Sequence, residues 1–107
     1  MAGQGESEMK SAVKDALKAR GAYWVAVPEG SFAKPGDPDL VVCYKGRFIG
    51  MEGKTPRGKL RDVQKLRRDQ IVAAGGIYAV VRSVEEAMKV LNEMDGEEHV
   101  QKEKESS

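Results

Sequence analysis

Hydrophobic residues recur with a helical period near the start of the chain. Met9, Val13 and Leu17 lie four positions apart, a spacing that gives a helix one buried stripe. We therefore predict a helix over residues 6–20, closed by Gly21, because glycine commonly follows the last turn of a helix. Residues 1–5 are expected to form a flexible N-terminus.

Three short runs of apolar, β-branched and aromatic residues come next, and they predict strands over 23–27, 40–44 and 48–52. Residues 29–38 hold two glycines and two prolines, so they are expected to form a loop. Lys45-Gly46-Arg47 leaves room only for a tight turn. The second and third strands must therefore be antiparallel neighbours.

The second half of the chain begins with a predicted helix over residues 60–74, ended by Gly75-Gly76. We expect its buried side to carry Val63, Leu66, Gln70 or Ile71, and Ala74. Residues 77–81 are nearly all apolar, which predicts a central strand of the sheet.

A third helix is predicted after Ser83, which would cap it, with Glu86 at the capping-box position. Its buried stripe is expected to consist of Ala87, Val90, Leu91 and Met94. From residue 96 to residue 107 the chain is polar and charged, and we expect a disordered acidic tail there.

The elements follow the order α-β-β-β-α-β-α, which places the chain in the α/β class. The hairpin is antiparallel, and the connection through the second helix allows the fourth strand to pair in parallel. We therefore predict one domain over residues 6–95, with a mixed four-stranded sheet flanked by helices on both faces. A length of 107 residues suits a single domain with a modest core.

Composition excludes several classes of protein and of site. Apolar residues make up 40% and charged residues 33%, as in soluble globular proteins, and no apolar run approaches the roughly 20 residues of a membrane span. The N-terminus has no signal-peptide pattern, so a cytoplasmic location is expected. Cys43, the only cysteine, is expected in the core, and His99, the only histidine, in the tail. A zinc cluster or a histidine-based triad is therefore not expected.

Basic residues concentrate between positions 54 and 68, where Asp62 is the only acid. They are Lys54, Arg57, Lys59, Arg61, Lys65, Arg67 and Arg68. Such a block suits a polyanion like nucleic acid, although a solvated helix face has the same composition. The loop at 29–38 could add contacts to a substrate through Ser31, Phe32 and Lys34.

Two carboxylates meet at the open end of the predicted hairpin. Asp39 precedes the second strand and Glu52 ends the third, with Lys54 two residues later. Paired carboxylate oxygens suit Mg²⁺, and a lysine beside the ion can orient water or stabilise charge on a phosphate. The pattern favours metal-dependent phosphodiester cleavage over the alternative of a turn residue and a solvated ion pair.

The chain resembles the PD-(D/E)XK nuclease superfamily, with its restriction-endonuclease-like fold, and within it the VRR-NUC family. The resemblance covers residues 6–91 and rests on an ordered set of motifs. These are Glu6 before the first helix, Gly36-x-Pro38-Asp39, Glu52-x-Lys54, Gly58-Lys59-Leu60, Gln64, Gly75-Gly76 and Val80-Val81-Arg82-Ser83. Gly53 departs from the pattern, because valine or alanine is usual at that position.

The resemblance implies roles for particular residues. Asp39 and Glu52 match the metal-binding acids, and Lys54 matches the catalytic lysine. Gln64 matches the glutamine that supports the site, and the carbonyl of Gly53 could be a further metal ligand. Glu6 matches the helical glutamate, which could bind the ion through water, with Glu8 as the reserve choice. Glu6 lies three residues before Met9 and so shares its stripe, although it could instead complement the helix dipole.

The implied activity is Mg²⁺- or Mn²⁺-dependent, structure-selective cleavage of DNA. Short members of the family, many from bacteriophages, are similar to Holliday-junction resolvases and act as homodimers, so a branched DNA and a homodimer are the expected partners. The phosphate contacts would come from Ser31, Lys34, Arg57, Lys59, Arg61, Lys65, Arg67 and Arg68. Two alternatives are a non-catalytic nucleic-acid-binding module and a nuclease subunit of a phage restriction or replication complex.

Overall fold

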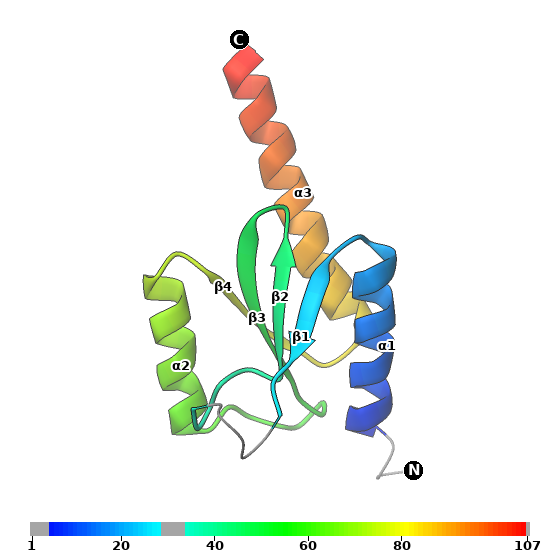
Figure 1. Ribbon diagram of the computed structural model, residues 1–107, viewed down its shortest axis with the longest axis vertical. Helices are drawn as coiled ribbons and strands as arrows, with labels where there is room; N and C mark the ends of the chain where they lie inside the picture. The colour runs from blue at the N-terminus through cyan, green and yellow to red at the C-terminus, as the bar shows by residue number, and fades with distance from the viewer. Residues whose placement is uncertain (1–4, 29–33, 107) are drawn as a thin grey trace.

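The computed structural model describes the backbone of residues 5–28 and 34–106, and within them the side chains from residue 7 to residue 96. The seven elements follow the predicted order (Figure 1). They are α1 (Gly5–Ala19), β1 (Tyr23–Ala26), β2 (Leu40–Tyr44), β3 (Arg47–Gly53), α2 (Asp62–Ala73), β4 (Ile77–Val81) and α3 (Val84–Ser106). No helix in these described parts of the chain is long and apolar enough to cross a membrane.

The four strands form one mixed sheet in the order β1-β2-β3-β4. The first two pairings are antiparallel and β3 pairs with β4 in parallel, as predicted. The prediction that β4 is central was wrong, since β4 lies at the edge beyond β3. Its sequence is apolar because α2 and α3 both pack against it, and not because strands flank it on both sides.

A two-residue turn sets the register of the hairpin. Lys45 has φ 50° and Gly46 has φ 80°, and positive φ at both positions is the geometry whose twist fits a tight hairpin. Tyr44 therefore pairs with Arg47, and Leu40 pairs with Met51. This register brings the residues next along each strand, Asp39 and Glu52, to the same end of the hairpin.

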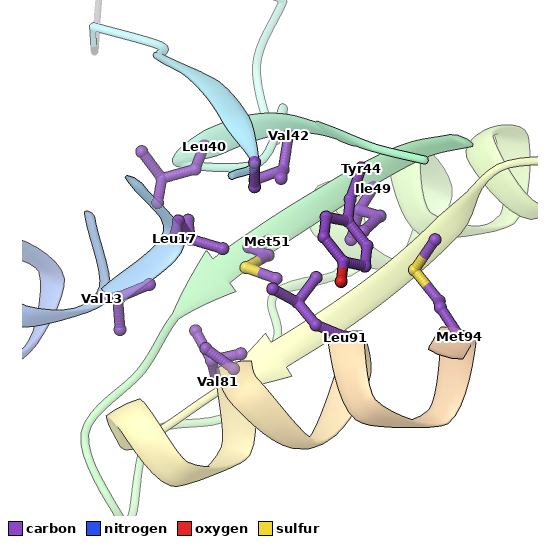
Figure 2. Close-up of a cluster of buried hydrophobic side chains, with 12 residues drawn as sticks. Val13, Leu17, Leu40, Val42, Tyr44, Ile49, Met51, Val81, Leu91 and Met94 are labelled. Atoms are coloured by element: carbon purple, nitrogen blue, oxygen red, sulfur yellow. The ribbon is translucent and has the colours of Figure 1, made fainter. Parts of the chain in front are cut away.

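The core lies between one face of the sheet and the helices α1 and α3 (Figure 2). The predicted stripes are buried there, with Val13 and Leu17 from α1 and Ala87 and Leu91 from α3 all at most 1% exposed. The strands contribute Leu40, Val42, Tyr44, Ile49, Met51 and Val81. Packing on this face fixes which side of each strand is buried, so the alternate residues of the hairpin point to the other face.

Helix α2 covers only part of that other face, which explains two corrections. Leu66 was expected to be buried but is 50% exposed, and Cys43 was expected in the core but is exposed. The helix packs against β4, and Ile71 fits the space that Gly50 leaves free, since an added β-carbon there would lie 3.1 Å from its Cδ1 atom. Ala74 also proves exposed, because it lies just beyond the last turn.

Helix α3 is longer than predicted. We placed its end near Asp95 and expected a disordered tail from residue 96 to residue 107, but the helix continues to Ser106 and extends beyond the sheet (Figure 1). Glutamate and lysine have high helix propensity, which outweighs the cost of about 1 kcal/mol for Gly96. The charge pattern that suggested disorder is equally typical of a solvent-exposed helix.

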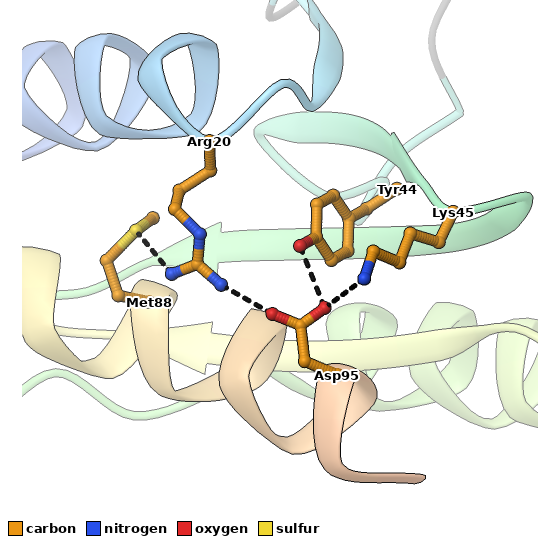
Figure 3. A network of polar contacts seen from close by, with 5 residues as sticks. All are labelled: Arg20, Tyr44, Lys45, Met88 and Asp95. Atoms are coloured by element: carbon orange, nitrogen blue, oxygen red, sulfur yellow. Dashed lines mark hydrogen bonds and ion pairs between the residues drawn. The ribbon is translucent and has the colours of Figure 1, made fainter. Parts of the chain in front are cut away.

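Asp95 ties α3 to the rest of the domain (Figure 3). Its carboxylate accepts hydrogen bonds from the Arg20 guanidinium at 2.8 Å and from the Tyr44 hydroxyl at 2.9 Å. The Lys45 ammonium forms an ion pair with the same carboxylate at 2.7 Å. These partners come from the residue after α1, the hairpin turn and β2. One acid therefore joins both flanking helices to the end of the hairpin that lies opposite Asp39 and Glu52.

Candidate functional site

Asp39 and Glu52 lie side by side at the open end of the hairpin, close enough for each to shift the pKa of the other. Asp39 is held in place by its backbone, because the Val27 N–H donates to its carbonyl at 2.9 Å. Its side-chain Oδ2 atom accepts the Gly53 N–H at 2.8 Å. Glu52 is only 3% exposed. The structure thus brings together the two acids that the sequence singled out.

The two acids stand in a cavity of about 600 Å³. Its lining is Lys10, Val27, Pro28, Lys34, Pro35, Gly36, Asp37, Asp39, Glu52, Gly53, Lys54, Arg61 and Gln64. Most of these residues are charged or polar, so the cavity suits a hydrated, charged ligand better than an apolar one.

Burial and the neighbouring carboxylate raise the pKa of Glu52 to about 8. The positive charges of Lys54 and Lys10 counteract part of that rise. Burial also acts to raise the pKa of Asp39, but the hydrogen bonds from Glu52 and the Gly53 N–H, with the charge of Lys10, lower it overall. Without a bound cation, these opposite shifts favour a single proton on the pair near neutral pH.

Gln64 fixes the orientation of Glu52 from α2. Its side-chain Nε2 donates to Glu52 Oε1 at 3.2 Å, while its Oε1 accepts the backbone N–H of Arg61 at 2.8 Å. Gln64 is 5% exposed, so this amide is locked between the start of α2 and the end of β3. The structure places the Gln64 amide against Glu52, and its supporting role in a reaction stays a prediction.

Lys54 lines the same cavity directly after β3. Its backbone N–H donates to the Val81 carbonyl at 3.0 Å, which extends the pairing of β3 with β4 by one residue. The following connector is held by Arg82, whose Nη2 donates to the Gly58 carbonyl at 2.8 Å. The Val-Arg-Ser segment therefore anchors the stretch of chain that carries Lys54.

The loop before Asp39 is packed on the start of α2. Gly36 has φ +84°, and an added β-carbon would lie 2.5 Å from the Val63 carbonyl oxygen. Arg67 reinforces this contact, because its Nε donates to the Pro35 carbonyl at 3.0 Å and lies 3.7 Å from Asp37. Arg67 thus holds the loop, a role that its predicted assignment as a DNA contact did not include.

The other predicted phosphate contacts fall into separate groups. Lys34 and Arg61 line the cavity. Arg57, Lys59 and Lys65 are exposed on the connector and α2. Arg68 is paired with Asp69 at 2.9 Å, and Ser31 and Phe32 lie outside the described residues.

The helical acid is only partly placed. Glu6 lies in the first turn of α1, four residues before Lys10, and its side chain is outside the described part of the chain. Glu8, the reserve choice, is exposed. The prediction that Glu6 takes part in the site therefore stays a prediction.

Two residues near the acids were missed in the sequence. The Lys10 ammonium lies 3.1 Å from Asp39 Oδ2. Tyr78 of β4 lies two residues before Val80, the register partner of Glu52, and its buried hydroxyl has no hydrogen-bond partner among the described residues. Burial and the charges of Glu52 and Asp39 raise the pKa of Tyr78 to about 12. Residues two apart on a strand share a face of the sheet, so Tyr78 lies on the same face as Val80, the residue paired with Glu52. The sequence could have indicated Tyr78 in this way.

The donors present fit a hard divalent ion. No cluster of three or more Asp, Glu, His or Cys side chains occurs among the described residues, so these offer the carboxylate pair alone. Mg²⁺ commonly uses one or two protein carboxylates and completes its shell with water and phosphate oxygens. A buried Glu52 beside a partly buried Asp39 is an arrangement of two acids that such an ion would stabilise.

Comparison with solved structures identifies the fold. The structure of a VRR_NUC domain superposes with a TM-score of 0.69 at 23% identity, covering 82% of this chain and 95% of that one. A VRR_NUC domain protein superposes with a TM-score of 0.65 at 20% identity, covering 83% of this chain and 86% of that one. No family model and no curated protein matches the chain. The chain has the VRR-NUC fold, as its ordered motifs predicted.

Proposed function

We propose that this protein is a metal-dependent DNA endonuclease that hydrolyses a phosphodiester at the Asp39–Glu52 end of the hairpin. One observation carries the proposal, namely that buried Glu52, oriented by Gln64, and partly buried Asp39 share a polar cavity with Lys54. Burying two carboxylates together is unfavourable unless a cation or a shared proton compensates them. A purely structural role gives no reason to retain such a pair.

Asp39 and Glu52 would hold Mg²⁺ or Mn²⁺, with the Gly53 carbonyl and, through water, Glu6 as further ligands. When bound, such an ion supplies Lewis-acid polarisation of the phosphate and a water of lowered pKa. Lys54, whose charge already acts on Glu52, orients the attacking water or stabilises charge on the phosphate. Gln64 keeps the Glu52 carboxylate in one orientation, so that the ligand geometry is preorganised.

The substrate is proposed to be DNA bound through its backbone. Lys34 and Arg61 line the cavity, and the exposed Arg57, Lys59 and Lys65 continue the positive charge along the connector and α2. Phosphate contacts carry no sequence information and weaken steeply with salt. We therefore expect low sequence preference, and selection among DNA molecules by their shape.

A four-way junction is the expected preferred substrate, and a homodimer is the expected acting form. Such a junction contains two equivalent strands, and a two-fold dimer would present one site to each of them. This part of the proposal rests on the resemblance to junction-cleaving nucleases. The cytoplasm is the expected location.

The decisive experiment incubates the protein with four-way junction, flap, splayed-arm and linear duplex DNA, with and without Mn²⁺. Cleavage should require Mn²⁺ or Mg²⁺. Asp39→Ala and Lys54→Ala should each lower the rate at least about 100-fold while leaving DNA binding largely intact. Surface variant Lys89→Ala, in α3, serves as the control and should cut like the original protein.

Other outcomes identify the alternatives. Tight binding of DNA without cutting under all metals would favour a non-catalytic binding module. Weak cutting of every DNA without preference would favour a nuclease that acts within a larger assembly. Cutting that survives Asp39→Ala would overturn the assignment of the site.

A further inference from the structure

Lys10 reaches the acid pair from α1, on the opposite side of the sheet from α2. Its ammonium lies 3.1 Å from Asp39 Oδ2, and it lines the same cavity as Glu52 and Lys54. Its side chain is 29% exposed and that of Asp39 is 21% exposed, so the contact is largely shielded from solvent. No motif of the sequence analysis assigned this lysine a role.

Gly53 provides the path that Lys10 takes. A β-carbon added to Gly53 would lie 2.8 Å from the Cε atom of Lys10 and 3.2 Å from its Cγ atom. The lysine stem thus crosses the bare backbone of Gly53 on the α1 side of β3. This explains a departure from the family pattern, because valine or alanine at position 53 would occupy the space that the stem now fills.

Lys10 and the Gly53 N–H both act on the same oxygen. Asp39 Oδ2 accepts the Gly53 N–H at 2.8 Å and lies 3.1 Å from the Lys10 ammonium. Asp39 is also one of the two acids that the proposed function assigns to the metal ion. A lysine charge and a divalent ion on one carboxylate repel each other, so the two cations compete for Asp39.

We propose that Lys10 is a second active-site cation, which occupies Asp39 in the metal-free protein, leaves it when a divalent ion binds, and then contacts a phosphate of the bound DNA. The inference rests on the function proposed above. A lysine has a long stem with several rotatable bonds, so its ammonium can move between these positions without any shift of α1. The competition lowers metal affinity until the DNA phosphate draws Lys10 away, and so couples ion binding to substrate binding.

The test measures the dissociation constant of Mn²⁺ by calorimetry for the original protein, Lys10→Met and Lys18→Met. Lys18 is the matched control, because it lies in the same helix, carries the same charge and is exposed away from the cavity. Lys10→Met should bind Mn²⁺ about tenfold more tightly without DNA, and Lys18→Met should match the original. Thermal melting checks that each variant is folded.

The second readout is the affinity for four-way junction DNA, measured in the presence of Ca²⁺. Ca²⁺ is chosen to occupy the metal site while the DNA binds. Lys10→Met should weaken this affinity severalfold more than Lys18→Met does, because a phosphate contact is lost at the site. If Lys10→Met binds Mn²⁺ and DNA with the same affinities as Lys18→Met, the inference is overturned. Weaker Mn²⁺ binding by Lys10→Met than by the original protein would also overturn the inference, because Lys10 would then support the metal site and not compete for it.

A double-mutant cycle tests the path over Gly53. Gly53→Ala should displace Lys10 and tighten Mn²⁺ binding, whereas the same change in a Lys10→Ala background should have little further effect. Equal effects in both backgrounds would contradict the proposed path. If the original protein binds no Mn²⁺ and cuts no DNA, the proposed function and this inference both fail. If it cuts with Mn²⁺ and the Lys10 variants behave like the control, only the inference fails.

Discussion

Asp39 and Glu52 are held together although their negative charges repel each other and burial disfavours the charged form of Glu52. Glu52 is 3% exposed and its pKa is raised to about 8, whereas the pKa of Asp39 is lowered. Neither shift would arise if the two side chains pointed into solvent. A buried acid that keeps its proton near neutral pH should reveal itself through the pH dependence of stability, even before any substrate is known.

We predict that the metal-free protein loses stability as pH rises from about 5 to about 8. In this range folded Glu52 keeps a proton that the unfolded chain, with an ordinary pKa of 4.5, has released. The folded state therefore binds more protons, and the free energy of unfolding falls with pH, by an amount on the order of 3 kcal/mol. Thermal melting in EDTA at several pH values measures the effect.

Glu52→Gln is the control for this titration, because it cannot lose a proton and should flatten the profile. Saturating Mg²⁺ should reverse the trend, since the ion binds the deprotonated pair and so stabilises the folded state more at higher pH. A melting temperature of the original protein that is independent of both pH and Mg²⁺ would count against the shared proton and the metal site together.

The sequence was sufficient to predict that Asp39, Glu52, Lys54 and Gln64 would lie together, but not that Lys10 would lie beside them. The first two follow from the short turn, which fixes the hairpin register and hence the end at which both acids lie. Lys10 depends instead on a contact between α1 and a glycine of β3, which no spacing along the chain encodes. The departure at Gly53 was visible, but its meaning required knowledge of which side chain fills the space.

At the scale of elements, α2 supports the site by carrying Gln64 and by receiving the loop that precedes Asp39. Gly36 makes the second contact possible, because an added β-carbon would lie 2.5 Å from the Val63 carbonyl oxygen. That neighbour is backbone at the start of a helix and cannot move aside easily. The loop and α2 therefore behave as one unit.

We predict that Gly36→Ala destabilises the protein by roughly 2–4 kcal/mol and lowers cleavage, because the loop must leave α2 and shift Asp39. Gly75→Ala is a matched control with a similar φ, +95° against +84°, and no atom within 4 Å of the added β-carbon. It should cost only about 1 kcal/mol of backbone strain and leave the activity intact. Chemical denaturation measures the free energy of unfolding of both variants. Equal decreases in the two would show that the contact with Val63 contributes nothing.

The predicted elements were placed well, while their exposure was predicted less well. Period and turn residues determine where Leu40–Tyr44 and the helices lie, and those signals are local. Burial depends on which neighbours exist. Cys43 is exposed because α2 packs against β4 and leaves part of that face of the sheet uncovered, and β4 is an edge strand although it is apolar.

For the whole molecule, the long helix α3 divides into two parts with different roles. Its first three turns bury Ala87, Leu91 and Met94 in the core, and Asp95 then joins Arg20, Tyr44 and Lys45. Beyond this network the helix continues past the sheet to Ser106 (Figure 1). The length of the extension was not predictable from hydrophobic pattern, because no apolar stripe continues there.

We predict that a chain ending at Gly96 keeps its melting temperature and its cleavage activity, whereas Asp95→Ala in the full chain lowers the melting temperature. The physical reason is that Tyr44 is only 6% exposed, so its hydroxyl loses a partner that solvent cannot fully replace, while Arg20 and Lys45 lose their shared anion. Glu93→Ala, on the exposed side of the same stretch of α3, is the control and should melt like the original protein. A markedly lower melting temperature for the truncated chain would contradict this prediction, because it would mean that residues beyond Gly96 contribute to the stability of the domain.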